Sequence, residues 1–253
     1  MLYLSDAIRG ELQTDKFNVI KAPCGSGKSY YAVNVLPSKV LGENPPLHKV
    51  LYLIDTINGR DGIIQSYPDK ARGYDEMIDK NQSFAFVDCE KNKVVVITYA
   101  KFGSLIKRNV DFAKNFRLII ADEFHNIYWP IPADRQQLWN AYPLFSSKSI
   151  EIMLEENSLN LAAMKALLCA ARNKDIMTVG ISATPEDAPG WREWADMPFN
   201  DICVAENVRH YTEHRTVHYG NVDAVIRSLP KGEKTLFYAT HIRDIKRFMT
   251  ACE

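Results

Sequence analysis

The amino-acid sequence predicts an α/β fold in which helices cover both faces of a mostly parallel sheet. Short, continuous apolar runs alternate with stretches of helical pattern along most of the chain. An uninterrupted apolar run is typical of a strand that is buried on both faces, as in a parallel sheet. The regular alternation of such strands with helices favours a doubly wound arrangement.

Five apolar runs are the strongest strand candidates, and one later segment is the clearest helix. We expect this helix over Ser158–Arg172, with Ser158 or Asn157 as its N-cap. A second helical pattern, Tyr30–Leu36, lies between the first two strands. The predicted strands are Phe17–Ala22, Lys49–Ile54, Val94–Thr98, Phe116–Ala121 and Ile176–Ile181.

The composition is that of a globular chain without a bulk electrostatic field. Hydrophobic residues make up 46% and charged residues 25%, and 31 basic residues balance 31 acidic ones. Any nucleic acid would therefore have to bind in a local groove. No apolar run approaches the roughly 20 residues that span a bilayer, and no signal peptide is identified, so we expect no membrane partner. The five cysteines form no CxxC pair, which fits reduced thiols in a cytoplasm and no structural zinc.

A polar, histidine-rich segment at Ala205–His218 marks the predicted domain boundary. We expect one domain over residues 1–207, and a linker followed by the start of a second α/β domain over residues 208–253. About 40 residues are too few for an independent core, so we expect the second domain to be truncated or completed by another chain. Its predicted elements are a helix at Val222–Leu229, a strand at Lys234–Ala239 and a helix at Arg243–Met249.

The motif APCGSGKS lies between the first predicted strand and the helical pattern that follows it. This is the setting of a phosphate-binding loop, in which glycines allow a tight turn and backbone N–H groups point at phosphates. Lys28 would reach the β- and γ-phosphates of a nucleotide, and Ser29 would bind Mg²⁺. A glycine-rich turn with an exposed lysine is the alternative. The candidate nucleotide-binding residues are Ala22, Pro23, Cys24, Gly25, Ser26, Gly27, Lys28 and Ser29.

Two carboxylates, Asp122 and Glu123, follow another apolar strand in the segment RLIIADEFH. Ligands of parallel sheets bind at the carboxyl ends of the strands. Adjacent strand residues point to opposite sides, so the two acids would serve different atoms. We expect Asp122 to hold Mg²⁺ and Glu123 to orient and deprotonate the attacking water. A strand that simply ends in a polar turn is the alternative, which the phosphate loop upstream disfavours.

A third block, GISATP at Gly180–Pro185, ends a further apolar strand. In this order, APCGSGKS, DEFH and SAT resemble motifs I, II and III of superfamily 2 helicases, in particular the DExH (DEAD/DEAH-like) group. Motif I of that family usually begins with alanine, as at Ala22. Weaker similarities extend the resemblance over nearly the whole chain; they are LYLIDT at Leu51–Thr56 (motif Ia), VITYAKF at Val96–Phe102 and KTLFYAT at Lys234–Thr240 (motif IV).

The resemblance implies a RecA-like P-loop NTPase domain that binds ATP and Mg²⁺ and acts on DNA or RNA as a helicase or translocase. It implies that Thr56 and Thr98 lie near loops that contact the nucleic-acid backbone. Motifs V and VI do not occur in the sequence, so we expect the second RecA-like domain to be missing and ATP hydrolysis to be weak or absent. No adenine-reading Q motif is identified. The residues implied to couple the nucleotide to the nucleic-acid groove are His125, Ser182, Ala183 and Thr184.

Two other functions stay open at this point. A packaging or remodelling motor is also a P-loop ATPase with an acidic pair, although SAT and Ala22 argue against it. A nucleotide-binding module that does not hydrolyse ATP is the second alternative.

Some further residues have a functional and a structural interpretation, and we expect the structural one. Histidines spaced by four could bind a metal on a helix, but their segment reads as a strand. Aromatic pairs could stack on bases, and a cysteine in the phosphate loop could support redox control, but packing and simple tolerance are the expectations. These residues are His210, His214 and His218, then Trp191 and Trp194, Tyr128 and Trp129, and Cys24.

Overall fold

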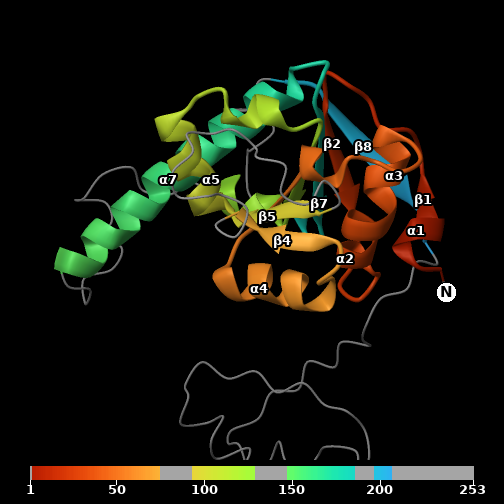
Figure 1. Cartoon of the computed structure of the whole chain (residues 1–253), viewed down its shortest axis with the longest axis horizontal. Coiled ribbons are helices and arrows are strands. Elements are labelled where there is room, and N and C mark those ends of the chain that lie inside the picture. Colours follow the sequence, from red (N-terminus) through yellow and green to blue (C-terminus); the bar gives the residue numbers. More distant parts are fainter. Residues whose placement is uncertain (1, 75–92, 129–146, 186–196, 207–253) are drawn as a thin grey trace, which may run out of the picture. The chain divides into compact units, whose positions relative to one another are not determined.

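The computed structural model describes residues 2–74, 93–128, 147–185 and 197–206, and an eight-stranded sheet lies at the centre of this part of the chain (Figure 1). The strand order is β1-β8-β2-β7-β6-β3-β5-β4. Every pairing is parallel except that of β1 with β8. The strands are β1 (Ile8–Arg9), β2 (Phe17–Lys21), β3 (Val50–Ile54), β4 (Ala71–Gly73), β5 (Val94–Thr98), β6 (Leu118–Asp122), β7 (Met177–Ser182) and β8 (Phe199–Val204).

Helices connect these strands and cover both faces of the sheet, as the sequence predicted. In Figure 1, α4 lies on one side of the sheet, and α5 and α7 lie on the other. The α-helices are α1 (Leu4–Ala7), α2 (Lys28–Tyr30), α3 (Leu36–Leu41), α4 (Ile57–Ser66), α5 (Tyr99–Arg108) and α7 (Ser147–Ala171). The other helical turns are η1 (Tyr31–Val35, a π-helix) and the 3₁₀ turns η2 (Leu47–Lys49), η4 (Phe112–Asn115) and η5 (Phe124–Tyr128).

The two faces of the sheet form two apolar clusters because successive strand residues point in opposite directions. Leu51, Val95 and Ile119 belong to the cluster that packs against α5 and α7. Tyr52 and Ile120 belong to the opposite cluster, under α1, η1, α3 and α4. Since the central strands are buried on both sides, their sequences are apolar at every position, which is why they could be recognised.

All five predicted strands are present, and their ends lie within two residues of the expected positions. Strands β1 and β4 have two and three residues, too few to give a pattern. Strand β8 was missed because polar residues interrupt it. A buried asparagine in β2 explains its position: Asn18 Oδ1 accepts a hydrogen bond from Asn200 Nδ2 of β8 at 2.7 Å, and Asn18 Nδ2 donates to the carbonyl of Thr178 in β7 at 3.0 Å.

The long helix α7 corrects the prediction of its start. The N-cap predicted at Ser158 or Asn157 is wrong, because the helix already begins at Ser147. The preceding residues include Leu154, Glu155 and Glu156, which favour a helix and allow it to continue. Within the helix, the hydroxyl of Ser158 instead accepts a hydrogen bond from Lys107 Nζ of α5 at 2.6 Å.

The helical pattern at Tyr30–Leu36 is confirmed, with a change of pitch that the sequence did not reveal. Helix α2 continues into the π-helical turn η1 and then into α3. Pro37 lies at the start of α3 and has no backbone N–H to donate to the preceding turn. A π-helical turn next to a proline is one way in which a helix accommodates such a missing hydrogen bond.

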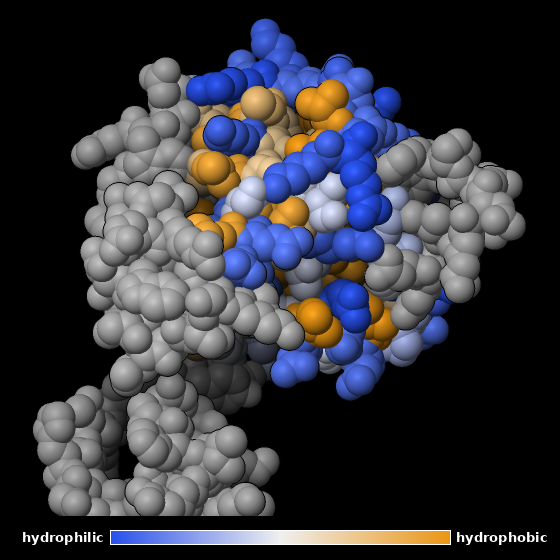
Figure 2. Space-filling view, turned by 90° about the vertical axis from the view of Figure 1, so that its left-hand side faces the viewer, coloured by the Kyte–Doolittle hydropathy of each residue, from blue (hydrophilic) through white to orange (hydrophobic). Residues whose placement is uncertain are grey.

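The described surface is polar over most of the face that Figure 2 shows, which is the left-hand side of Figure 1. Hydrophobic residues on it form small groups between hydrophilic ones. Of the helices in the described ranges, none is long and apolar enough to cross a bilayer.

The chain divides into two compact units, and all described residues belong to the first, Met1–Tyr211. The second unit, Thr212–Glu253, lies outside the described residues, so the boundary at 207/208 and the elements expected after it stay predictions. The same holds for other proposed residues, namely Trp129, Trp191, Trp194, His210, His214 and His218.

The close crossing of α5 and α7 can be tested at a glycine. A β-carbon at Gly103 would overlap the backbone carbonyl group of Leu159, whereas a β-carbon at Gly62 of α4 would meet nothing within 4 Å. We expect Gly103→Ala to lower the free energy of unfolding by about 1–3 kcal/mol in urea denaturation. Gly62→Ala, the matched control, should be neutral or stabilising by up to about 1 kcal/mol. Equal effects of the two substitutions would contradict the described packing.

Candidate nucleotide-binding site

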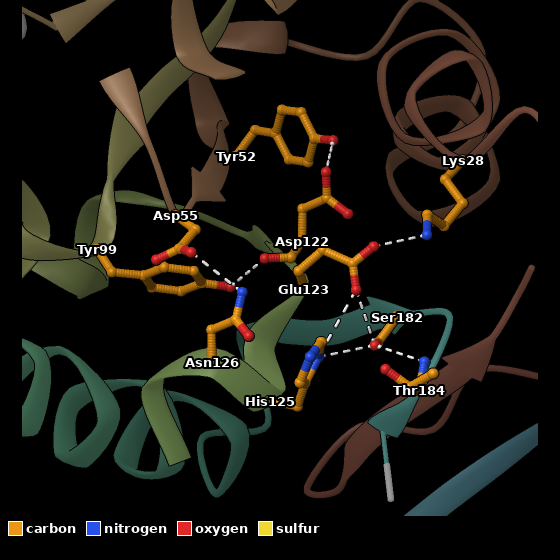
Figure 3. A network of polar contacts seen from close by, with 10 residues as sticks. All are labelled: Lys28, Tyr52, Asp55, Tyr99, Asp122, Glu123, His125, Asn126, Ser182 and Thr184. Carbon is orange, nitrogen blue, oxygen red and sulfur yellow. Dashed lines mark hydrogen bonds and ion pairs between the residues drawn. The ribbon is translucent and has the colours of Figure 1, made fainter. Parts of the chain in front are cut away.

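The three sequence motifs meet at one edge of the sheet, where the adjacent strands β2, β7 and β6 end. Two backbone hydrogen bonds extend the pairing just beyond the strands. The N–H of Ala22 donates to the carbonyl of Ser182 at 2.8 Å, and the N–H of Glu123 donates to the carbonyl of Ile181 at 2.8 Å. The phosphate-loop motif, the acidic pair and SAT are therefore neighbours in space (Figure 3).

The loop after β2 has the backbone that a phosphate-binding loop requires. Gly25 and Gly27 have φ angles of 77° and 92°, which glycine adopts far more readily than other residues. Gly27 directly precedes α2. The carbonyl of Ser26 accepts a hydrogen bond from the N–H of Leu4 at 2.9 Å, which ties the loop to α1. The hydroxyl of Ser26 is buried and has no hydrogen-bond partner.

Lys28 and Glu123 form an ion pair across this edge, with 2.6 Å between Nζ and Oε1. The two side chains are 13% and 32% exposed, so the pair is partly withdrawn from water. Coulombic attraction between such groups is stronger than between fully solvated ones. Lys28 thus points at the acidic pair, as Figure 3 shows.

The backbone of Glu123 is in the left-handed region, with φ of 45°, which is uncommon for a residue other than glycine. The next residue, Phe124, is fully buried. Its ring centroid lies 5.3 Å from that of Phe17 in β2, and a β-carbon at Gly180 would lie 2.6 Å from each of these rings. This packing holds the turn that aims Glu123 at the site, which fits the tendency of strained residues to occur at functional sites.

Asp122 is 8% exposed, and two tyrosines bind it. The hydroxyl of Tyr52 donates to Oδ2 at 2.7 Å, and the hydroxyl of Tyr99 donates to the backbone carbonyl at 2.8 Å. The other carboxylate oxygen, Oδ1, is buried without a hydrogen-bond partner. Burial raises the pKa of Asp122, and the charge of Glu123 adds to the rise, while the Tyr52 hydrogen bond and Lys28 oppose it.

Ser182 connects Glu123 to the rest of the third motif. Its hydroxyl donates to Glu123 Oε2 at 2.9 Å, lies 2.8 Å from His125 Nδ1 and accepts from the N–H of Thr184 at 3.1 Å. A hydroxyl has one hydrogen to donate, so His125 Nδ1 must carry the hydrogen that it shares with Ser182. Of the four predicted coupling residues, Ser182 and Ala183 hydrogen-bond to Glu123, and His125 Nδ1 lies 3.6 Å from Glu123 Oε2. Thr184 contacts Ser182 and not Glu123.

Opposing effects set the pKa of Glu123. Burial raises this pKa, but the hydrogen bond and the charge of Lys28 lower it, as do hydrogen bonds from Ser182 and Ala183. The lowering effects outweigh burial, and the pKa lies below its ordinary value. Glu123 is therefore ionised at neutral pH and bound to Lys28.

The donor set at this edge fits Mg²⁺ together with phosphate groups. Mg²⁺ binds oxygen ligands and is held in nucleotide sites by one or two carboxylates plus substrate phosphates. The partnerless Asp122 Oδ1 is such an oxygen, and the hydroxyl of Ser29, next to Lys28 in α2, is a second candidate. Among the described residues, no group of three or more His, Cys, Asp or Glu side chains is arranged to hold a metal ion.

A comparison with family models matches residues 3–187 to the model described as type III restriction enzyme, res subunit (ResIII). This chain belongs to the ResIII family. Its residues 3–187 form an ATP-binding domain of the superfamily 2 helicase type, with a RecA-like fold. A search of the curated proteins gave no match.

Two solved helicase structures resemble the ResIII chain. The UvsW helicase from bacteriophage T4 has 13% sequence identity and a TM-score of 0.39, over 74% of this chain and 54% of that one. The DUF1998 helicase MrfA bound to DNA has 15% identity and a TM-score of 0.41, over 76% of this chain and 25% of that one. The ResIII chain thus spans about half of the first protein and a quarter of the second.

Two predicted residues of the ResIII domain lie on the far side of β6 from the phosphate loop: Thr56 follows β3, and Thr98 is the last residue of β5. Both are helix N-caps. The Thr56 hydroxyl accepts from the N–H of Gly59 at 3.1 Å in α4, and the Thr98 hydroxyl accepts from the N–H of Lys101 at 3.2 Å in α5. Both hydroxyls already accept hydrogen bonds from backbone N–H groups of the helices. A nucleic acid that contacts these threonines would therefore also contact the N-terminal ends of α4 and α5.

Sequence reasoning missed three polar residues of the site. Tyr52 lies in a predicted strand, and a tyrosine in a buried strand usually needs a partner for its hydroxyl, which was the available signal. Tyr99 follows the predicted strand at Val94–Thr98. Asn126 Nδ2 donates to Asp55 Oδ2 at 3.0 Å and joins the segment after β6 to the segment after β3, a contact without a sequence signal.

The influence of Lys28 on Glu123 is testable by NMR titration of the Glu123 carboxyl carbon. We expect Lys28→Met to raise the Glu123 pKa, because burial then acts without the opposing charge. Lys28→Arg, the control, keeps the charge and should keep most of the lowering. Because the Glu123 pKa is lower in the folded than in the unfolded chain, ionised Glu123 stabilises the fold at pH values above the ordinary pKa of 4.5. This stabilisation is lost as the pH falls through the folded-state pKa. An unchanged midpoint in Lys28→Met would contradict the described ion pair.

Proposed function

We propose that this domain binds and hydrolyses Mg-ATP as the motor core of a DExH-type nucleic-acid helicase or translocase. The observation that carries the proposal is the meeting of Lys28, Asp122 and Glu123 at the carboxyl ends of adjacent strands. Membership of the ResIII family supports the ATP-binding part. The hydrolysis, the metal, the roles of single residues and the nucleic-acid track are our proposals.

The phosphate loop would bind the triphosphate of the nucleotide through its backbone N–H groups. The positive φ angles of Gly25 and Gly27 allow this backbone to curve around an anion. Lys28, at the start of α2, would then neutralise charge on the β- and γ-phosphates. Asp122 Oδ1 and the Ser29 hydroxyl would hold Mg²⁺, which when bound neutralises charge that develops on the phosphates.

Glu123 would act as the general base for the attacking water. Lys28 binds Oε1 of Glu123 at 2.6 Å. An arriving phosphate competes for the same ammonium group, and once Lys28 turns to the phosphate, Glu123 loses the charge that lowers its pKa. The carboxylate then becomes a better proton acceptor, at the moment when a substrate is present. Ser182 and Ala183 would keep its orientation.

The third motif would carry the change at Glu123 to the nucleic-acid groove. Ser182 Oγ contacts both Glu123 Oε2 and His125 Nδ1, so a shift of Glu123 changes the partners of His125. The Asn126–Asp55 hydrogen bond continues the connection from the segment after β6 to the segment before Thr56. The N-terminal ends of α4 and α5, capped by Thr56 and Thr98, would attract backbone phosphates of DNA or RNA.

A complete motor would need a second RecA-like domain. We propose that residues 208–253 comprise a linker and the beginning of that domain, on the resemblance of KTLFYAT to motif IV. A cytoplasmic location is also proposed. The described cysteines, Cys24, Cys169 and Cys203, are free thiols, in keeping with a reducing compartment.

Binding and turnover of Mg-ATP test this function. We expect Lys28→Ala to weaken binding of a fluorescent ATP analogue about 10- to 100-fold, because one charge-assisted contact to the phosphates is lost. Glu123→Gln should bind ATP but lower its turnover by about 100-fold or more. Lys114→Ala, which alters an exposed lysine ahead of β6, is the matched control and should resemble the wild type.

Each sample is measured without nucleic acid, with single-stranded DNA and with RNA, and the stimulating polymer identifies the track. Equal binding by the wild type and Lys28→Ala would refute the proposed site. Turnover that no polymer stimulates would favour a packaging or remodelling ATPase. Binding without turnover, even with a second RecA-like domain supplied, would favour a nucleotide-binding module that does not hydrolyse ATP.

A further inference from the structure

Tyr52 is a buried tyrosine whose hydroxyl reaches the acidic pair from a neighbouring strand. It lies in β3, is 1% exposed and pairs in register with Ile120 of β6. Residues 120 and 122 of β6 point to the same face of the sheet, because side chains alternate along a strand. The ring of Tyr52 therefore lies beside Ile120, and its hydroxyl extends to Asp122 Oδ2 at 2.7 Å (Figure 3).

The hydrogen bond between Tyr52 and Asp122 has a defined direction. An ionised carboxylate only accepts hydrogen bonds, so Tyr52 donates its single hydrogen to Asp122 Oδ2.

One of the three oxygens of Asp122 has no hydrogen-bond donor. Oδ2 is bound by Tyr52, and the backbone carbonyl is bound by Tyr99. Oδ1 is buried and has no hydrogen-bond partner. A buried carboxylate oxygen without a donor costs free energy unless another group, such as a cation, compensates it.

We infer that Tyr52 is a positioning residue for the magnesium site, in that it binds Asp122 Oδ2 and leaves Oδ1 of the same carboxylate for the metal. The inference rests on the proposed function, because that function assigns Asp122 to the metal. Residues that orient metal ligands in this way commonly change metal affinity about 10- to 100-fold when they are replaced.

A structural role and a positioning role of Tyr52 differ in what the hydroxyl does. A tyrosine with a purely structural role would fill space with its ring, and phenylalanine would replace it without any effect on metal binding. A positioning role needs the hydroxyl that binds Asp122 Oδ2.

The test compares Tyr52→Phe with Tyr31→Phe and Asp122→Asn in the full chain. Tyr31 is a matched control, since it is also 1% exposed and lies in the same apolar cluster, with Lys39 over its ring. Two quantities are measured with a fluorescent ADP analogue: its affinity in EDTA, and the Mg²⁺ concentration that half-saturates the metal-dependent gain in affinity. Thermal unfolding in EDTA verifies that each variant is folded.

We expect Tyr52→Phe to raise the half-saturating Mg²⁺ concentration about 10- to 100-fold while its affinity in EDTA stays within about twofold of the wild type. Tyr31→Phe should match the wild type in both. In an Asp122→Asn background, Tyr52→Phe should cause no further shift, because its partner is already lost.

Three results would overturn the inference, and they differ from one another. An unchanged Mg²⁺ requirement in Tyr52→Phe, with a strong loss in Asp122→Asn, would make Tyr52 a core residue only. Equal losses in EDTA and in Mg²⁺ would make its role a general structural one. An Mg²⁺ requirement that survives in Asp122→Asn would refute the proposed metal site itself, and the role of Tyr52 with it.

Discussion

The parallel register of β2, β7 and β6 is the constraint on which the candidate site depends. It places Lys21 opposite Ser182, and Asp122 opposite Ile181, so that three loops from distant parts of the chain begin side by side. Apolar side chains on both faces hold this register, and a shift by one residue would turn every one of them to the other face. The packing of the core, through the strand register, therefore determines where the three loops of the site begin.

Electrostatic interactions give the two acidic residues of the site different properties. Two carboxylates with restricted access to water share a single lysine, and their pKa values move apart, upward for Asp122 and downward for Glu123. Two chemically similar carboxylates thus differ in pKa and in partners. Asp122 has a buried oxygen without a hydrogen-bond partner, and Glu123 is bound to Lys28. In our account, a triphosphate is the anion that exchanges these partners. The same edge continues through Ser182 and Asn126 toward the helices that Thr56 and Thr98 cap.

The sequence was sufficient for the fold class and for the neighbourhood of the motif residues, because continuous apolar runs and strand-end motifs are local signals. Side-chain contacts that depend on the register between strands could not be predicted from the sequence. The hydrogen bond from Tyr52 to Asp122 needs the alignment of β3 with β6. The position of β8 depends on the Asn18–Asn200 hydrogen bond, although the strand itself is interrupted by polar residues. Helix α7 begins earlier than predicted, because serine and asparagine within a helix-forming stretch need not mark the start of a helix.

The most direct measurement is a crystal structure of this chain with Mg²⁺ and a non-hydrolysable ATP analogue. We expect phosphate oxygens against the loop at Gly25 and Gly27, with Lys28 Nζ on the phosphates and no longer on Glu123. We also expect the metal at Asp122 Oδ1, with the Tyr52 hydrogen bond to Oδ2 retained. An analogue bound elsewhere, or a phosphate in the loop beside an intact Lys28–Glu123 ion pair, would contradict the proposed nucleotide site.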